Sequence, residues 1–500
     1  MLNEFFKQFK SGTDIRGVAT EGVAGQSVNL TDDVIEKMAD GFVLWLSDKV
    51  KKSPAELKIS VGRDSRISGP HIMELTTNRF KAAGAEVLRC GLASTPSMFM
   101  TTVDLGCDGA LQITASHHPF NRNGLKFFTR EGGLEGSDIE AILTYAQNDE
   151  HPKAADGGSI TDCDYMTAYA QGLCDKIRRE VNAEDYDHPL KGFHIVVDAG
   201  NGAGGFYADK VLSVLGADTS GSRYLDPDGM FPNHVPNPED ATAMASICEA
   251  VRENNADLGV IFDTDVDRGG AVDSKGNEIN RNRLVAVAAA IALEGNDGGT
   301  IVTDSITSSG LKEFIEQNLG GKHYRYRRGY KNVIDKALEL NAAGINCPLA
   351  IETSGHAAMR ENYFLDDGAY LCTKIIIKAA QLRKAGKDLS DLTADLKEPL
   401  ESIEKRFQIT EKDFRACGER IIADLTAYAE NQDGWQLADD NREGVRVSFG
   451  KDNGDGWFLL RLSVHDPIMP LNIESNSEGG TDVIYKQLYK FLETTEGLNI

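Results

Sequence analysis

Hydrophobic and polar positions follow the same order in three separate segments of the chain. Each segment begins with a short β-branched run, continues with glycine, serine and aspartate, and then shows apolar residues at helical spacing up to a glycine. These segments start at Lys58, His194 and Thr300. Repeated strand-loop-helix units are typical of a doubly wound sheet. The pattern therefore predicts three α/β domains of similar topology.

The pattern changes after about residue 398. Helical segments are followed there by GVRVSFGKDNGDGWFLLRLS, in which two alternating runs flank DNGDG as in an antiparallel hairpin. This favours a C-terminal α+β domain, and a chain of 500 residues is long enough for several cores. The expected domains are 1–185, 186–296, 297–398 and 399–500. The apolar run from Leu284 to Leu293 is too short to span a bilayer and predicts a buried helix.

Composition and charge narrow the class of protein. The chain is 41% hydrophobic and 26% charged, as in ordinary globular proteins, and no signal peptide is indicated. Its eight cysteines are scattered without a CxxC pair, which predicts reduced thiols in the cytoplasm. The net charge of -24 argues against nucleic acid or an anionic membrane as the main partner. An anionic ligand would need positive residues gathered locally.

Three aspartates follow a buried-strand run in VIFDTDVDRGG. Asp263, Asp265 and Asp267 are spaced by two, which in an extended segment turns the carboxylates to one side. Crowded carboxylates favour a bound cation, and oxygen ligands select magnesium or calcium. The EF-hand pattern fails because Arg268 and Ser274 stand where it needs glycine and glutamate. Magnesium fits better, with Arg268 as a phosphate partner, and a solvated acidic turn is the alternative.

The stretch TASHHPFNRNGLKFF, residues 114–128, brings a hydroxyl, imidazoles and an ammonium into one loop. Ser116 could be only a turn residue. The G-x-S-x-G pattern is absent, and His117, as the next residue, is expected to be poorly placed to bond the Ser116 hydroxyl. A hydrolase triad is therefore not indicated. A serine that carries phosphate would need a metal and cations instead of an adjacent base.

These motifs resemble those of the α-D-phosphohexomutase superfamily, the phosphoglucomutases and phosphomannomutases, in family order from about residue 12 to residue 475. TASHHP is similar to the phosphoserine loop, DTDVDR to the magnesium loop, ETSGH to the sugar-binding loop and RLSVHDP to the phosphate-binding loop. Further similarities are GTDIRG, VGRDSR, NGLKF, FPNHVPNPE, RRGYKNV and the DDG at Asp366. The resemblance implies that the four expected domains surround a central cleft.

The resemblance also implies an isomerase that interconverts hexose 1-phosphate and hexose 6-phosphate. Ser116 would carry the phosphoryl group, and hexose 1,6-bisphosphate would be the intermediate and the activator. Magnesium would be held by Asp263, Asp265, Asp267 and Ser116. The candidates for general acid and base are Arg16, Lys126 and His356. Sugar contacts are expected from Glu352, Ser354, His356, Gly329 and Lys331, phosphate contacts from Arg461, Ser463, His465 and Arg268, and further contacts from Arg63 and His117.

The resemblance accounts for the positive residues that an anionic ligand would need, because it implies that cations gather around the cleft of an otherwise acidic protein. They are Arg16, Arg63, Lys126, Arg268, Arg327, Lys331 and Arg461. Departures from the family pattern are His118 in the serine loop and Val464, His465 and Pro470 in the phosphate loop. Losing a glycine at position 464 restricts the backbone, so the phosphate loop is expected to be reshaped.

Other functions stay open at this point. DAGNGAGG, from Asp198 to Gly205, fits G-x-G-x-x-G after a strand and could indicate a dinucleotide-binding oxidoreductase. A sugar-phosphate-binding protein without turnover is a second alternative. Within the family, the ETSGH loop is similar to that of phosphomannomutases and dual phosphomanno/phosphoglucomutases, and phosphoglucosamine mutases share its Ser-Gly-His ending. We expect mannose and glucose phosphates as substrates, in that order, with a phosphoglucosamine mutase as the alternative. We expect a monomer or homodimer with a small phosphosugar substrate and neither nucleic acid nor membrane as partner.

Overall fold

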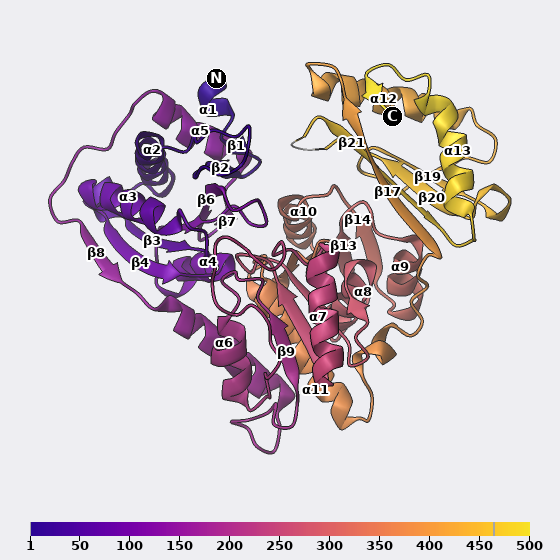
Figure 1. Cartoon of the computed structure of the whole chain (residues 1–500), viewed down its shortest axis with the longest axis horizontal. Helices are drawn as coiled ribbons and strands as arrows, with labels where there is room; N and C mark the ends of the chain where they lie inside the picture. Colours follow the sequence, from indigo (N-terminus) through magenta and orange to yellow (C-terminus); the bar gives the residue numbers. More distant parts are fainter. Residues whose placement is uncertain (1, 464–465) are drawn as a thin grey trace. The chain divides into compact units, whose positions relative to one another are not determined.

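The computed structural model describes residues 2–463 and 466–500, and its chain forms two compact units (Figure 1). The first unit runs to Asn280 and also contains Ser354–Ala358 and Leu365–Ser390. The second unit contains Arg281–Thr353, Met359–Phe364 and Asp391–Ile500. The two units are therefore interleaved along the sequence.

The first unit contains an eight-stranded sheet in the order β1-β2-β6-β5-β3-β4-β8, with β7 paired to β6. The strands are β1 Lys10–Ser11, β2 Asp14–Val18, β3 Lys58–Arg63, β4 Glu86–Leu92, β5 Gly109–Ile113, β6 Arg122–Thr129, β7 Gly132–Gly133 and β8 Ser159–Asp162. The helices are α1 Glu4–Lys7, α2 Asp32–Val50, α3 Gly69–Ala82, α4 Thr95–Asp104, α5 Gly136–Gln147 and α6 Tyr165–Val181.

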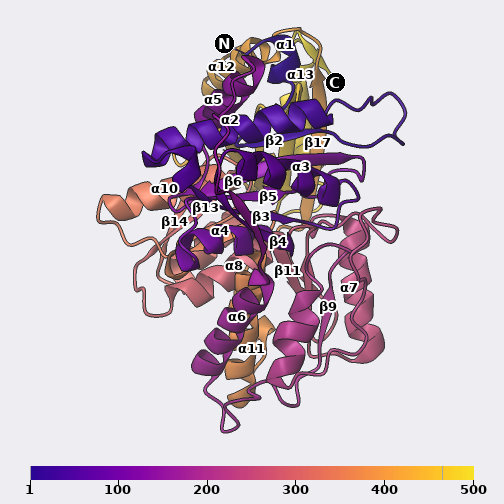
Figure 2. The ribbon, with the colours of Figure 1, turned by 90° about the vertical axis from the view of Figure 1, so that its left-hand side faces the viewer.

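Alternate residues of β3 show how helices cover both faces of this sheet (Figure 2). Ile59 and Val61 join the core formed with α2, α3 and α5. Ser60 faces the other way and its hydroxyl lies 2.5 Å from that of Thr101 on α4. A Cβ on Gly62 would meet Met98 of α4 at 2.5 Å, so this helix packs directly on the backbone. Successive side chains of a strand point to opposite faces, which gives the α/β/α layers.

A second sheet of the first unit has the order β12-β11-β10-β9. Its strands are β9 Ile195–Asp198, β10 Leu258–Phe262, β11 Gly269–Val272 and β12 Glu278–Ile279, and its helices are α7 Ala241–Asn254 and α11 Gly368–Lys384. The helix expected after β9 is wound as a π-helical turn over Tyr207–Leu212. The Ser213 hydroxyl donates to the Ala208 carbonyl, five residues earlier, and competes with the α-helical hydrogen bonds there.

Both sheets are mixed rather than wholly parallel. The strand β5 runs parallel to β3 but antiparallel to β6, and β10 runs parallel to β9 but antiparallel to β11. The serine loop joins β5 to β6, and the aspartate loop joins β10 to β11. Such short connections can join only antiparallel strands, since a parallel pair needs a long crossover. Each loop thus leaves the carboxyl end of a parallel strand, where open α/β sheets bind ligands.

The third sheet has the order β14-β13-β15-β16. Its strands are β13 Thr300–Thr303, β14 Lys322–Arg325, β15 Leu349–Ile351 and β16 Ala357–Met359. The helices are α8 Arg281–Leu293, α9 Ser309–Glu313, which continues as a π turn over Phe314–Asn318, and α10 Tyr330–Ala342. The apolar run ending at Leu293 lies in α8 and is buried, which confirms the expected core helix.

The fourth sheet has the order β18-β19-β20-β21-β17-β22. Its strands are β17 Glu401–Ile409, β18 Gln436–Leu437, β19 Val445–Phe449, β20 Gly456–Leu460, β21 Ile468–Ser475 and β22 Leu498–Asn499, with α12 Phe414–Glu430 and α13 Gly480–Leu492. The helices share one apolar core with the sheet. The strands β19 and β20 form the expected antiparallel hairpin, with Phe449 opposite Gly456.

A buried arginine connects the fourth sheet to the loop after β13 within the second unit. The Arg446 guanidinium lies 3.6 Å from the centre of the Trp457 ring. It donates to the Ser305 carbonyl at 2.9 Å and to the Thr307 carbonyl at 3.1 Å. Arg325 of β14 makes a second connection of this kind, in which its Nη1 donates to Oδ2 of Asp440 at 2.6 Å. The charge of Arg446 is thus buried with a stacked ring and two carbonyl acceptors.

These layers confirm the expected fold class of three α/β parts and a C-terminal α+β part. The four domain boundaries and the central cleft stay predictions. Among the described helices, none combines the length and the apolar character needed to cross a membrane.

Truncating Phe127 to alanine should cost about 3 to 5 kcal/mol of unfolding free energy, because its ring is buried and stacks on Phe42 at 4.4 Å. Denaturant unfolding followed by circular dichroism measures this loss. Phe127→Leu is the matched control, and it should lose less because it keeps most of the buried apolar area. Equal midpoints for wild type and Phe127→Ala would contradict the packing.

Candidate active site

Ser116 lies in the turn between β5 and β6 and has a left-handed backbone, with φ of 49°. Its amide donates to the Thr114 hydroxyl at 2.9 Å. Its own hydroxyl is largely buried and lies between two charged groups of the aspartate loop. It accepts from Nη2 of Arg268 at 2.9 Å and donates to Oδ2 of Asp263 at 3.2 Å. The predicted serine and aspartate loops therefore meet within the first unit.

The expectation that His117 lies out of reach of the serine is wrong. Its Nδ1 atom is 3.3 Å from the Ser116 hydroxyl, because the left-handed turn brings the next residue back toward it. The same nitrogen accepts from Nη2 of Arg268 at 2.6 Å. Burial and the Arg268 charge lower the pKa of His117 to about 2, so the ring is neutral. Because this nitrogen already accepts a hydrogen bond from the Arg268 guanidinium, it is not available as the base of a hydrolase triad.

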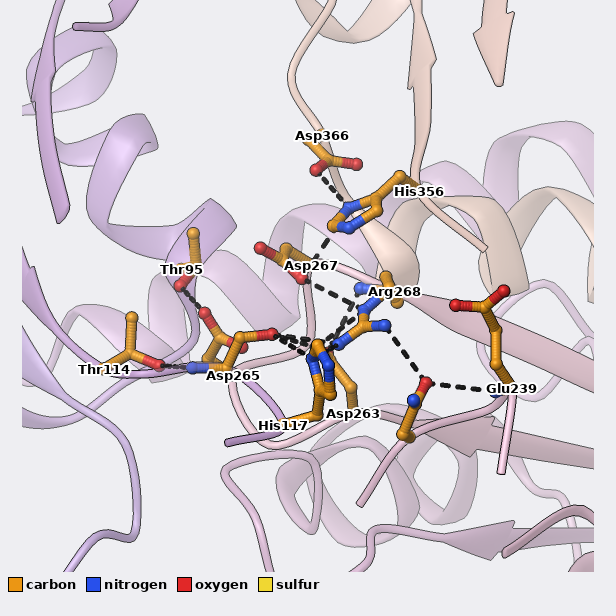
Figure 3. A network of polar contacts seen from close by, with 12 residues as sticks. Thr95, Thr114, His117, Glu239, Asp263, Asp265, Asp267, Arg268, His356 and Asp366 are labelled. Carbon is orange, nitrogen blue, oxygen red and sulfur yellow. Dashed lines mark hydrogen bonds and ion pairs between the residues drawn. The ribbon is translucent and has the colours of Figure 1, made fainter. Parts of the chain in front are cut away.

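Asp263, Asp265 and Asp267 are brought together as predicted, but in a turn rather than in an extended segment. The turn places Val266 at φ of 68° between two of them. One oxygen from each carboxylate lies within 4.8 Å of the others, and all three residues are buried (Figure 3). The alternative of a solvated acidic turn is therefore wrong for these residues.

The electrostatics of the three aspartates fit a cation. Burial, followed by the neighbouring Asp267 charge, raises the pKa of both Asp263 and Asp265. Oδ1 of Asp265 and Oδ1 of Asp267 are buried, and neither accepts a hydrogen bond from the described residues. Buried carboxylate oxygens without donors are what a hard divalent ion requires, since it supplies the missing positive charge. The residues present therefore fit such an ion.

Lys126 and His356 lie on one side of this cluster, against Asp267. The Lys126 ammonium is 2.9 Å from Oδ2 of Asp267, and both groups are buried. Nδ1 of His356 is 2.6 Å from Asp366 and 3.8 Å from Asp267. Burial opposes ionisation of Asp267, but Lys126, His356 and Arg268 together hold its pKa below its usual value. Two of the three predicted proton-transfer candidates thus contact a carboxylate of the cluster.

The other predicted residues of the first unit have the following positions and contacts. Arg16 on β2 pairs with Asp14 at 3.2 Å. Arg63 ends β3 and donates to the Asp64 carbonyl at 2.9 Å. Ser354 lies in the short segment 354–358, which also supplies His356.

The remaining predicted sugar and phosphate contacts belong to the second unit. The Glu352 carboxylate accepts from the Gly329 amide at 2.5 Å. Lys331 pairs with Asp335 at 2.6 Å. Arg461 is buried at the end of β20, and the Ser463 hydroxyl accepts from the Asp466 amide at 3.3 Å. His465 and Val464 lie outside the described residues.

Sequence reasoning missed several residues that support the site. Thr95, at the start of α4, bonds Asp265 through its hydroxyl and donates its amide to the Asp265 carbonyl at 2.8 Å. Asn237 accepts from Nη1 of Arg268 at 3.0 Å. Asp366 hydrogen-bonds to His356, and Arg66 donates to the backbone carbonyl of Ser116. Asn237, Asp366 and Arg66 stand in motifs noted for their resemblance, which was the available signal.

Known proteins resemble this chain along most of its length. Models of phosphoglucomutase/phosphomannomutase α/β/α domains I, II and III match residues 8–153, 168–276 and 280–399. A phosphoglucomutase of Neisseria meningitidis is 28% identical over 499 residues, which cover 100% of this chain and 98% of that protein. A phosphomannomutase/phosphoglucomutase of Pseudomonas aeruginosa is 29% identical over 425 residues, 84% of each chain. A crystal structure of a phosphoglucomutase/phosphomannomutase family protein from Burkholderia thailandensis has a TM-score of 0.79 at 25% identity, covering 100% of this chain and 99% of that one.

Proposed function

The chain belongs to the phosphoglucomutase/phosphomannomutase family of α-D-phosphohexomutases, and on that premise we propose that it interconverts hexose 1-phosphate and hexose 6-phosphate through a phosphorylated Ser116. The observation that carries this proposal is the position of the Ser116 hydroxyl. It lies 2.9 Å from Arg268 and 3.2 Å from Asp263, one of three buried carboxylates suited to a cation. A serine so placed has the surroundings that phosphoryl transfer requires.

In this proposal the serine phosphate passes to the free hydroxyl of the bound hexose phosphate. The sugar then carries two phosphates, and the serine regains its proton. After the bisphosphate turns over, its other phosphate returns to Ser116, so hexose 1,6-bisphosphate is both intermediate and activator. Arg268 is placed to hold the transferring oxygens, since its guanidinium already contacts the serine hydroxyl.

Asp263, Asp265, Asp267 and Ser116 would hold magnesium, which when bound offsets negative charge on the transferring phosphoryl oxygens. Lys126, His356 and Arg16 are the candidates to take up or donate the proton of the sugar hydroxyl. Lys126 has its ammonium fixed by Asp267, and His356 is oriented by Asp366. These contacts fix the direction of each donor before a substrate arrives.

The remaining proposed contacts to the substrate rest on the resemblance of the motifs. Glu352, Gly329 and Lys331, together with Ser354 and His356 of the first unit, are proposed to bind sugar hydroxyls. Arg461, Ser463 and His465 are proposed to bind the distal phosphate. Arg63 and His117 are proposed as further residues of the site, without an assigned role. We favour mannose and glucose phosphates over glucosamine phosphate. All eight cysteines are free thiols, in keeping with the cytoplasmic location that we propose.

A dinucleotide-binding function is not favoured, because packing already accounts for the glycines after β9. A Cβ on Gly202 would lie 2.5 Å from the Thr264 carbonyl, and one on Gly205 would lie 2.2 Å from the Leu225 carbonyl. The Asp198 carboxylate is occupied by Ser246 at 2.7 Å and by His234 at 3.1 Å. These glycines therefore admit the protein's own backbone.

Turnover of mannose 1-phosphate, glucose 1-phosphate and glucosamine 1-phosphate tests the proposal. With magnesium and a catalytic amount of hexose 1,6-bisphosphate, we expect activity on the mannose and glucose substrates. Leaving out the bisphosphate is the matched control, and it should delay or reduce turnover when Ser116 starts unphosphorylated. Binding without turnover of any of the three would favour a sugar-phosphate-binding protein, and activity confined to glucosamine phosphate would reassign the substrate.

A further inference from the structure

A buried arginine lies directly beneath the serine loop. Arg66, in the connection between β3 and α3, has no exposed surface. Its two terminal nitrogens donate to backbone carbonyls of the loop rather than to side chains. Nη1 reaches the carbonyls of Pro119 and Arg122, both at 2.8 Å, and Nη2 reaches those of Ser116 at 2.5 Å and His118 at 2.6 Å.

These contacts use every N–H group on the two terminal nitrogens of Arg66, whereas its Nε makes no hydrogen bond among the described residues. Two terminal nitrogens carry four N–H groups, and each of the four has one carbonyl acceptor. The planar fork therefore fixes the positions of four peptide groups between Ser116 and Arg122. An ammonium could not replace it, because its donors diverge from one point. One side chain thus binds four of the seven peptide carbonyls from Ser116 to Arg122.

Asp64 pairs with Arg66, and the side chain of Thr114 separately binds the amide of Ser116. Asp64 lies 3.3 Å from Nε of Arg66 and accepts the Arg66 amide at 2.9 Å. The Thr114 hydroxyl accepts a hydrogen bond from the Ser116 amide at 2.9 Å. The left-handed turn at Ser116 is therefore bound on its amide side and on its carbonyl side.

The opposite side of Arg66 is closed by the segment before α7. The Phe231 ring lies 5.2 Å from the guanidinium. A Cβ on Gly229 would approach the Ser65 carbonyl to 2.5 Å, so this segment packs against the backbone beside Arg66. With no exposed surface, the arginine touches neither solvent nor substrate.

We propose that Arg66 is a positioning residue for phosphoryl transfer, acting through the serine loop; this inference rests on the proposed function. A non-glycine residue at φ of 49° is held there only by its surroundings. Without the guanidinium, four carbonyls of the loop lose their donor, and the loop must rearrange to hydrate the buried carbonyl of Ser116. Ser116 then loses its alignment with Arg268 and Asp263, while residues that contact the sugar stay in place.

The test compares Arg66→Ala and Arg66→Lys with wild type. We expect kcat, and the rate at which hexose 1,6-bisphosphate phosphorylates Ser116, to fall together by about 100-fold. KM for the hexose phosphate should stay within about threefold, because Arg66 contacts no substrate. Millimolar guanidinium should restore part of the rate to Arg66→Ala, whose vacated space accepts the ion, and none to Arg66→Lys.

Arg79→Met is the matched control for loss of stability alone. Arg79 lies on α3 and donates to the buried Asp40 through Nε at 2.9 Å, away from the serine loop. It should lower Tm while keeping kcat below the transition. The inference is overturned if Arg66→Ala keeps the wild-type kcat, if Arg79→Met at equal Tm loses as much kcat, or if guanidinium has no effect. If Arg66→Ala does not fold, Arg66→Lys is the test. The inference then requires that kcat of Arg66→Lys falls while its KM stays within about threefold of wild type. Wild type that never phosphorylates Ser116 overturns the proposed function, and this inference with it.

Discussion

Replacing Ser116 with alanine is expected to lower mutase turnover by at least about 10⁴-fold, the scale of loss when a covalent nucleophile is removed. The variant removes the hydroxyl that lies between Arg268 and Asp263, and no other hydroxyl takes its place in those contacts. The fold should be retained, because the carbonyl bonded by Arg66 and the amide bonded by Thr114 belong to the backbone. Substrate binding should also persist.

Two measurements check this prediction. Radiolabelled hexose 1,6-bisphosphate should label wild type on Ser116 and leave Ser116→Ala unlabelled, and the coupled turnover assay should follow the labelling. Ser137→Ala makes the same chemical change at an exposed position of α5 and should keep both labelling and turnover. Undiminished activity of Ser116→Ala, or a label on another residue, would contradict the proposed route of the phosphoryl group.

Replacing Asp265 with asparagine is expected to weaken magnesium binding by more than the ~10- to 100-fold that loss of an outer-shell partner costs. Oδ1 of Asp265 is buried with no hydrogen-bond donor among the described residues, so the ion is its expected partner. Asparagine keeps an oxygen that can bond Thr95 and removes the charge. Turnover should fall with magnesium occupancy.

Stability separates this effect from a local packing defect. Without metal, Asp265→Asn should be at least as stable as wild type, because it removes one of three crowded buried carboxylates. With magnesium at 100 times its Kd, wild type should gain about 2.7 kcal/mol and the variant far less. The order of the two proteins should therefore reverse with magnesium in thermal unfolding.

Asp257→Asn is the control, since Asp257 stands just before β10, at the opposite end of the strand that leads into the aspartate loop. It should show the same magnesium-dependent gain as wild type. An equal gain in Asp265→Asn would mean that the ion does not bind at these carboxylates. Retention of the full magnesium response together with lost turnover would assign Asp265 a role other than holding the metal.

Residue identity revealed the aspartate loop, because three carboxylates at a spacing of two directly after an apolar strand have few structural uses. It also revealed the serine loop, through the polar groups gathered after β5. The order of elements was equally legible, since strand-loop-helix units and the C-terminal hairpin have distinct periods. The residues around Glu352, Lys331 and Arg461 form no local pattern that indicates a function by itself, and the roles of these three residues stay predictions.

Other features depend on backbone geometry that side-chain identity does not encode. The contact of His117 with Ser116 follows from the left-handed φ of Ser116. The sequence does not indicate this conformation, because it is usually marked by a glycine and position 116 is a serine. The partners of Arg66 are carbonyl groups about fifty residues away, and every residue has a carbonyl. Reading along the chain also places divisions in sequence order, whereas the first unit takes in Ser354–Ala358 and Leu365–Ser390.

The contact of Arg446 with Trp457 and with the loop after β13 limits which segments two relatives could exchange in a hybrid protein. A hybrid that took its last hundred or so residues from a relative would inherit the fourth sheet but keep its own loop after β13. The carbonyls of Ser305 and Thr307 would then need a donor from a foreign strand. We therefore expect a stable hybrid to require that Arg446, Trp457 and that loop come from the same parent, although about 140 residues separate the loop from the arginine in sequence.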